Sequence, residues 1–83
     1  MRSPMSKYAN YLLDFGTLLR ECANEARQMR DESQAGSEQR MFQSGRLMAL
    51  YEVVSLMQHQ AKVFEIPLAE LRLDGIDPNR DLL

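Results

Sequence analysis

Apolar residues recur with helical spacing through the first third of the chain. The recurring residues are Tyr8, Leu12, Phe15, Leu19, Cys22, Ala26 and Met29. Their separations alternate between four and three, which is the period of a seam between two packed helices. Ser3 or Ser6 can cap the first turn, and Pro4 is tolerated there. The pattern predicts a helix over about residues 5–32.

The same alternation returns in the second half of the chain. Its apolar positions are Leu47, Leu50, Val54, Met57, Ala61 and Phe64. In the intervening residues 33–37, Gly36 suits a left-handed helix end and Ser37 can cap the next helix. Pro67 ends that helix, because the residue before a proline avoids the helical region. The sequence therefore predicts a second helix over about 38–64 and an all-α fold based on a long antiparallel helical hairpin.

Folding the chain at the turn brings the two seams together. The expected pairs are Leu19 with Leu50, Phe15 with Val54, Leu12 with Met57, Tyr8 with Ala61, and Met5 with Phe64. Every pair is apolar on both sides, which favours this register. Gly16 and Gly45 lie inside the predicted helices, where glycine costs up to about 1 kcal/mol relative to alanine. We expect tight helix packing at both glycines.

A second apolar set lies outside the seam and predicts a partner. Its members are Tyr11, Leu18, Met41, Met48, Tyr51 and Leu56. Within residues 47–57 the only charge is Glu52, and a helix that is apolar on nearly every side must be covered on every side. Two helices cannot bury both sets. We therefore expect two hairpins to pair through the second set as a homodimeric four-helix bundle with twofold symmetry. The alternative is that the C-terminal tail covers this set.

The tail, residues 66–83, has its own helical signals. Pro67 can open a short helix, Gly75 can end it, and Asp77 with Pro78 reads as a cap followed by a first-turn proline. From residue 65 onward, two basic residues, Arg72 and Arg80, are outnumbered by the acids Glu65, Glu70, Asp74, Asp77 and Asp81. We expect a short acidic appendage whose leucines pack on their own hairpin, with attachment of Leu82 and Leu83 to a partner as the other possibility.

The composition indicates in which cellular compartment the protein is expected. The chain has 83 residues and a net charge of −2, which fits one small globular domain. Cys22 is its single cysteine, so an internal disulfide is excluded and a reducing compartment is favoured. At a helical apolar position we expect Cys22 to be buried. Asn10 and Asp14 interrupt any signal-peptide core, and the longest apolar run is too short to cross a membrane. We expect a cytoplasmic protein without membrane contact.

Residues for catalysis or metal binding are scarce. His59 is the only histidine, and Leu56 occupies the position where a carboxylate-bridged metal bundle would need glutamate. Glu52 precedes His59 by one heptad, roughly 10 Å along the axis, too far to share one ion. The four glycines are scattered, so no phosphate loop exists. We expect no cofactor, no metal and no enzymatic activity. Glu52, Arg46 and His59 remain a candidate polar site.

Arginines gather toward the turn end of the hairpin, which raises the question of nucleic-acid binding. They are Arg20, Arg27, Arg30, Arg40 and Arg46. Acidic residues are interleaved with them, namely Glu25, Asp31, Glu32 and Glu38. This mixture is typical of a salt-bridged surface, and no recognition-helix pair or aromatic interleaving accompanies it. The sequence argues against a nucleic-acid partner.

Taken together, these patterns predict a small, non-enzymatic helical interaction or regulatory module that acts as a homodimer. Its partner is a second copy or another protein. The alternative is a ligand-binding or enzymatic bundle with a cavity near Cys22, Gly45 and Ala49. Glu52 or Arg46 would then supply the polar group.

Overall fold

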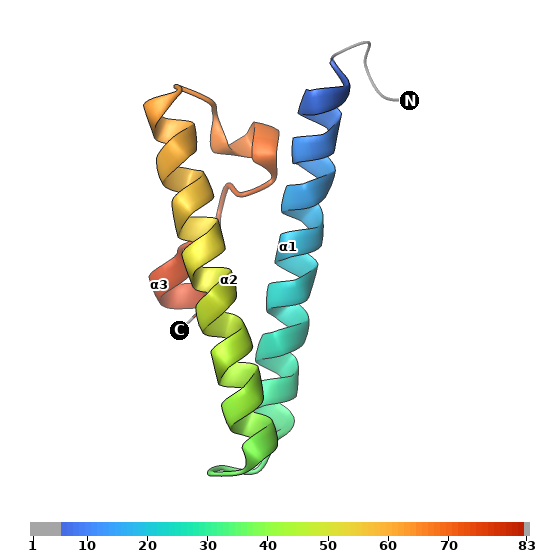
Figure 1. The fold of residues 1–83 in the computed structure, drawn as a ribbon, viewed down its shortest axis with the longest axis vertical. Helices are drawn as coiled ribbons and strands as arrows, with labels where there is room; N and C mark the ends of the chain where they lie inside the picture. Colours follow the sequence, from blue (N-terminus) through green and yellow to red (C-terminus); the bar gives the residue numbers. More distant parts are fainter. Residues whose placement is uncertain (1–5, 83) are drawn as a thin grey trace.

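Two long antiparallel helices form the body of the protein (Figure 1). The computed structural model describes residues 6–82, in which α1 spans Lys7–Glu32 and α2 spans Glu38–Val63. The Ser6 hydroxyl caps α1 by accepting a hydrogen bond from the Ala9 backbone N–H at 3.2 Å, and Ser37 caps α2 in the same way. The predicted all-helical hairpin is confirmed for the described part of the chain. The positions of Ser3, Pro4, Met5 and Leu83 lie outside it.

The closed end of the hairpin is fixed by a glycine and an arginine. Gly36 has a φ of +79°, in the left-handed region that glycine adopts without strain, as the sequence predicted. The Arg40 side chain reaches back from α2 and donates to the carbonyl oxygens of Arg30 at 3.2 Å and Ser33 at 3.1 Å. The last carbonyls of a helix have no partner within the helix, so these two bonds cap α1 and close the turn.

After α2 the chain reverses and returns through the hairpin. A backbone hydrogen bond from Ile66 to the Ala61 carbonyl, 2.7 Å long, closes the end of α2, and the chain then forms the short 3-10 helix η1, Leu68–Leu71. Figure 1 shows η1 between the open ends of α1 and α2. The last helical turn, α3, spans Pro78–Asp81 beside the middle of α2, and Asp77 caps it as the sequence predicted.

The buried core joins all three segments of the chain. Its apolar members are Ala23, Ala26, Leu47, Val54, Ala61, Leu71, Leu73 and Leu82. The last three come from the tail, here taken as residues 66–82, so the tail packs on its own hairpin. Leu73 is fully buried and Leu82 is 2% exposed. The side chain of Leu82 is therefore covered within the chain.

The position of η1 overturns part of the predicted register. Tyr8 and Phe64, which the prediction placed in the seam at the open end, are each 70% exposed. Phe15 is 38% exposed, although Val54, its predicted partner, is buried. The predicted pairing is wrong here because the tail lies between the two helices where the prediction brought them together. The seam of α2 is as expected from Leu47 to Ala61.

The buried side of α1 is rotated from the predicted one. Gly16 and Ala23 are buried, while Cys22 is exposed, so the expectation of a buried cysteine is wrong. A Cβ atom on Gly16 would overlap the carbonyl oxygen of Leu71 and lie 2.8 Å from its carbonyl carbon. Tight packing is therefore confirmed at Gly16, against the tail. Gly45 has no atom within 4 Å of such a position, so tight packing there is wrong.

Candidate interaction surface

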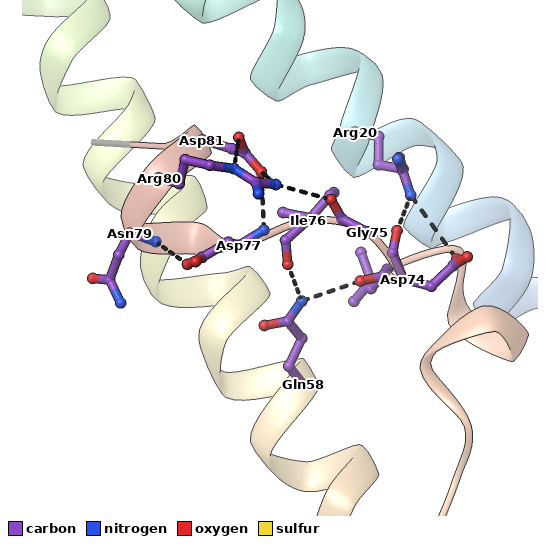
Figure 2. Close-up of polar contacts among 10 residues, drawn as sticks. Arg20, Gln58, Asp74, Gly75, Ile76, Asp77, Asn79, Arg80 and Asp81 are labelled. Atoms are coloured by element: carbon purple, nitrogen blue, oxygen red, sulfur yellow. Dashed lines mark hydrogen bonds and ion pairs between the residues drawn. The ribbon is translucent and has the colours of Figure 1, made fainter.

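Side chains of the two helices donate hydrogen bonds to four backbone carbonyls of the tail, and Figure 2 shows those to Asp74 and Ile76. Arg20 donates to the carbonyls of Arg72 (2.9 Å) and Asp74 (2.7 Å), Gln58 to those of Leu73 (3.1 Å) and Ile76 (2.9 Å), and Arg80 to that of Gly75 (3.2 Å). Arg20 lies on α1 and Gln58 on α2, so residues 72–76 are bound from both sides. We call this arrangement the carbonyl clamp. Backbone carbonyls in a segment outside any helix or sheet thus find hydrogen-bond donors on side chains.

The last turn of the tail is held by a second set of polar contacts. The Tyr51 hydroxyl on α2 donates to the side-chain oxygen of Asn79 at 3.0 Å. Arg80 donates to both carboxylate oxygens of Asp81, and the Asp77 backbone N–H also donates to Asp81, at 2.9 Å. The hydrogen bond from Arg80, followed by that from the Asp77 backbone, holds the pKa of the Asp81 carboxyl far below its usual range. Asp81 is therefore ionised wherever the tail is folded in this way.

These contacts place the tail on one side of the hairpin. On α1 it meets Gly16 and Arg20, which are four residues apart and so lie above one another on the helix. On α2 it meets Tyr51 and Gln58, which are seven residues apart and also share one side. One side of the hairpin is thus covered within the chain.

The opposite side is apolar and uncovered. On α1 the exposed residues Tyr8, Tyr11, Phe15 and Leu18 follow three-and-four spacing, roughly 130° around the helix from the strip that contacts the tail. On α2, Phe42, Val53 and Phe64 lie across the seam from Tyr51 and Gln58. We call the seven residues Tyr8, Tyr11, Phe15, Leu18, Phe42, Val53 and Phe64 the tail-free face; their exposed fractions run from 38% for Phe15 to 70% for Tyr8 and Phe64.

The size of the tail-free face is that of a protein interface. An aromatic side chain has about 150–250 Å² of surface, so the exposed fractions correspond to about 700 Å². A stable interface buries about 800 Å² on each partner. The half-buried Leu12, Leu50 and Met57 line the seam between its two strips. An ion pair between Arg46 of α2 and Glu25 of α1, 3.2 Å long, lies between Phe42, which is one turn nearer the closed end, and the other six residues of the face.

The six predicted interface residues are divided among different sides of the hairpin. Tyr11 and Leu18 lie on the tail-free face, and Leu56, 63% exposed, adjoins it three residues after Val53. Met48 lies three residues before Tyr51, toward the tail, and Met41 precedes Met48 by one heptad; both are exposed.

Tyr51 is half-buried and bonded to the tail. Sequence reasoning left Phe42 and Val53 unassigned. It also placed Tyr8, Phe15 and Phe64 in the seam, although their large exposed side chains complete the same face. Only the position of the tail reveals which side of each helix remains open.

The candidate polar residues do not form one site. Glu52 is exposed, and Arg46 bonds to Glu25 and to the side-chain oxygen of Gln43. His59 is exposed at the edge of a groove beside the tail. Gln43, only 2% exposed, occupies a seam position one turn before Leu47 that sequence reasoning did not extend to.

A metal site and a cavity near the turn receive no support from the geometry. Among residues 6–82, no three His, Cys, Asp or Glu side chains are grouped so that they could hold a metal ion. Cys22, Gly45 and Ala49 are exposed, and the cavities found in the described part of the chain are lined by other residues.

Arginines, by contrast, have clear structural partners. Arg20, Arg40 and Arg80 donate to backbone carbonyls, and Arg30 and Arg46 pair with carboxylates. The predicted salt-bridged surface near the turn is confirmed for Arg30 and Arg46.

No helix within the described residues combines the length and apolar character needed to cross a membrane. No family model, curated protein or solved structure matches this chain.

Proposed function

We propose that this protein is a small, non-enzymatic interaction module of the cytoplasm that acts as a homodimer through its tail-free face. One observation carries the proposal: seven large apolar residues are exposed on one side of the hairpin, while the tail covers the other side. Soluble monomers rarely expose contiguous apolar patches of this size unless another molecule covers them.

A second copy is the partner that fits this surface best. Apart from the Arg46–Glu25 ion pair, the side chains of the tail-free face are uncharged. The face therefore offers apolar area to a partner, without a pattern of one charge sign that would select a partner of the opposite sign. A twofold axis through this face would bring the same residues of both copies into contact. Two hairpins joined in this way form a four-helix bundle with both tails on the outside.

Matched charge insertions test the proposal. Leu18 and Met48 are 58% and 56% exposed, on the tail-free face and toward the tail respectively. Light scattering at about 100 µM, a concentration well above the micromolar Kd of a modest interface, should give the mass of two chains for the wild type. Leu18→Glu should give one chain, because a charge in the apolar interface has no partner, and Met48→Glu should still give two.

Circular dichroism of both variants provides the control for folding, since each substituted side chain is exposed in one copy. A wild-type mass of one chain at this concentration would overturn the homodimer. Loss of the dimer in Met48→Glu alone would place the interface on the side that includes Met48 and contradict the assignment to the tail-free face.

A further inference from the structure

A groove separates the C-terminal half of α2 from the tail. Its open cavity has a volume of about 630 Å³. The lining residues are Ser55, Gln58, His59, Lys62, Ile66, Pro67, Leu68, Pro78 and Asn79. Small-molecule sites typically have volumes of about 300–1,000 Å³, mostly apolar walls and a few polar groups. The groove exists only because the tail folds back, and it lies away from the tail-free face.

The two ends of this lining differ in chemistry. Ile66 and Leu68 are half-buried apolar side chains that also pack against the core. His59 and Lys62 lie one helical turn apart on α2, and both are exposed. No carboxylate lines the groove, and Lys62 makes no ion pair within the described part of the chain. The groove therefore carries a positive charge, that of Lys62.

The amides of the groove also favour an anion. The side-chain amide of Gln58 donates hydrogen bonds to two tail carbonyls, and these bonds hold the Gln58 side chain in place as one wall of the groove. The side-chain oxygen of Asn79 accepts a hydrogen bond from the Tyr51 hydroxyl. The side-chain amide nitrogen of Asn79 can therefore donate to a bound group. The Lys62 ammonium, the His59 imidazole and the Asn79 amide can all donate to a bound group.

We propose that this groove binds an apolar monocarboxylate. The hydrocarbon part lies against Ile66, Pro67 and Leu68, and the carboxylate accepts hydrogen bonds from Lys62 and His59. A carboxylate paired with an exposed ammonium contributes modest affinity, while the apolar contact supplies the larger part. The site is independent of the proposed dimer, because it lies on the side that the tail covers.

Octanoate is the probe, with 1-octanol as its neutral counterpart. Titration into uniformly ¹⁵N-labelled wild-type protein should shift the backbone amide resonances of residues 55–62, 66, 68 and 79. Octanoate should bind about two- to fivefold more tightly than octanol, the factor expected for one exposed ion pair. Lys62→Met keeps the apolar stem and should remove that preference. Lys7→Met, the control, changes the only other lysine and should leave it intact.

Ser55→Leu provides a second test that does not depend on charge. Ser55 is half-buried in the groove wall on α2, and leucine is a better helix former, so the variant should fold and obstruct the cavity. Binding of octanoate and octanol should both weaken. The proposal is overturned if octanol binds as well as octanoate, if Lys62→Met keeps the preference, or if the shifts lie on the tail-free face.

Discussion

The side of the hairpin that the tail covers and the tail-free face differ in the residues that they present. The side covered by the tail has small residues, Gly16 and Ala23, together with long polar side chains, Arg20 and Gln58, aimed at backbone carbonyls. The tail-free face instead carries large aromatic and aliphatic residues. A loop brought against a helix needs backbone space and hydrogen-bond donors, whereas another helix needs only apolar side chains. The composition of one side thus fits the tail that covers it, and the composition of the other side is what the proposed pairing with a second hairpin requires.

The largest expected contrast is between a leucine on each side. Leu73, whose carbonyl is part of the carbonyl clamp, has a fully buried side chain, so Leu73→Ala should lower the free energy of unfolding by about 2–5 kcal/mol through lost burial and a residual cavity. Leu18→Ala should change it by less than about 0.5 kcal/mol in the isolated chain. Urea denaturation at low protein concentration measures both, because dimerisation would otherwise add to the stability. Equal effects would show that the tail does not pack as described.

Two glycines provide the next contrast. Gly16→Ala forces a Cβ atom into the backbone of Leu71 and should cost about 1–3 kcal/mol, the usual range for overpacking. Gly45→Ala meets open space in a helix interior and should stabilise the protein by about 0.5–1 kcal/mol. The two thermal midpoints should therefore move in opposite directions. A stabilising Gly16→Ala would mean that η1 does not press against α1.

The carbonyl clamp should contribute a smaller amount. Arg20→Met keeps the stem of the side chain but removes two hydrogen bonds to tail carbonyls, and we expect a loss of about 1–2 kcal/mol. Arg72→Met removes an exposed arginine whose side chain makes no hydrogen bond within residues 6–82, and it should have little effect. Hydrogen exchange at the amides of residues 68–82 should quicken in the first variant only.

Lowering the pH is expected to have the smallest effect on the covered side, through protonation of Asp81. Because the pKa of Asp81 is lowered in the folded protein, its contribution is complete above the ordinary aspartate pKa of about 3.9 and is lost as pH falls through the lower folded value. Asp81→Asn removes that contribution at every pH. The difference in stability between wild type and Asp81→Asn should therefore shrink below about pH 4, the lower end of the usual aspartate range. A difference that stays constant down to pH 2 would contradict the ion pair.

The sequence was most informative where local rules decide the structure. Capping by Ser37, the left-handed Gly36 and the turn that opens at Asp77 each depend on a few neighbouring residues. The seam of α2 followed from periodicity, since its large residues Leu47 and Val54 are the buried ones.

The rest required contacts between distant segments. Hydrophobic periodicity gives weight to large side chains, so it favoured Phe15 and Cys22 over their buried neighbours Gly16 and Ala23. The bonds of Arg20 to the tail join residues more than 50 positions apart, and nothing in the local sequence marks them. Without the position of the tail, the covered and open sides of the hairpin could not be separated.

The lone thiol reports directly on whether the open side is covered in solution. Cys22 is exposed and lies four residues after Leu18, at the end of the α1 strip of the tail-free face. Its rate constant for reaction with a maleimide should fall as the wild-type concentration rises through the dimerisation range, and should stay high throughout in Leu18→Glu. A wild-type rate constant that is the same at every concentration would contradict pairing through this face.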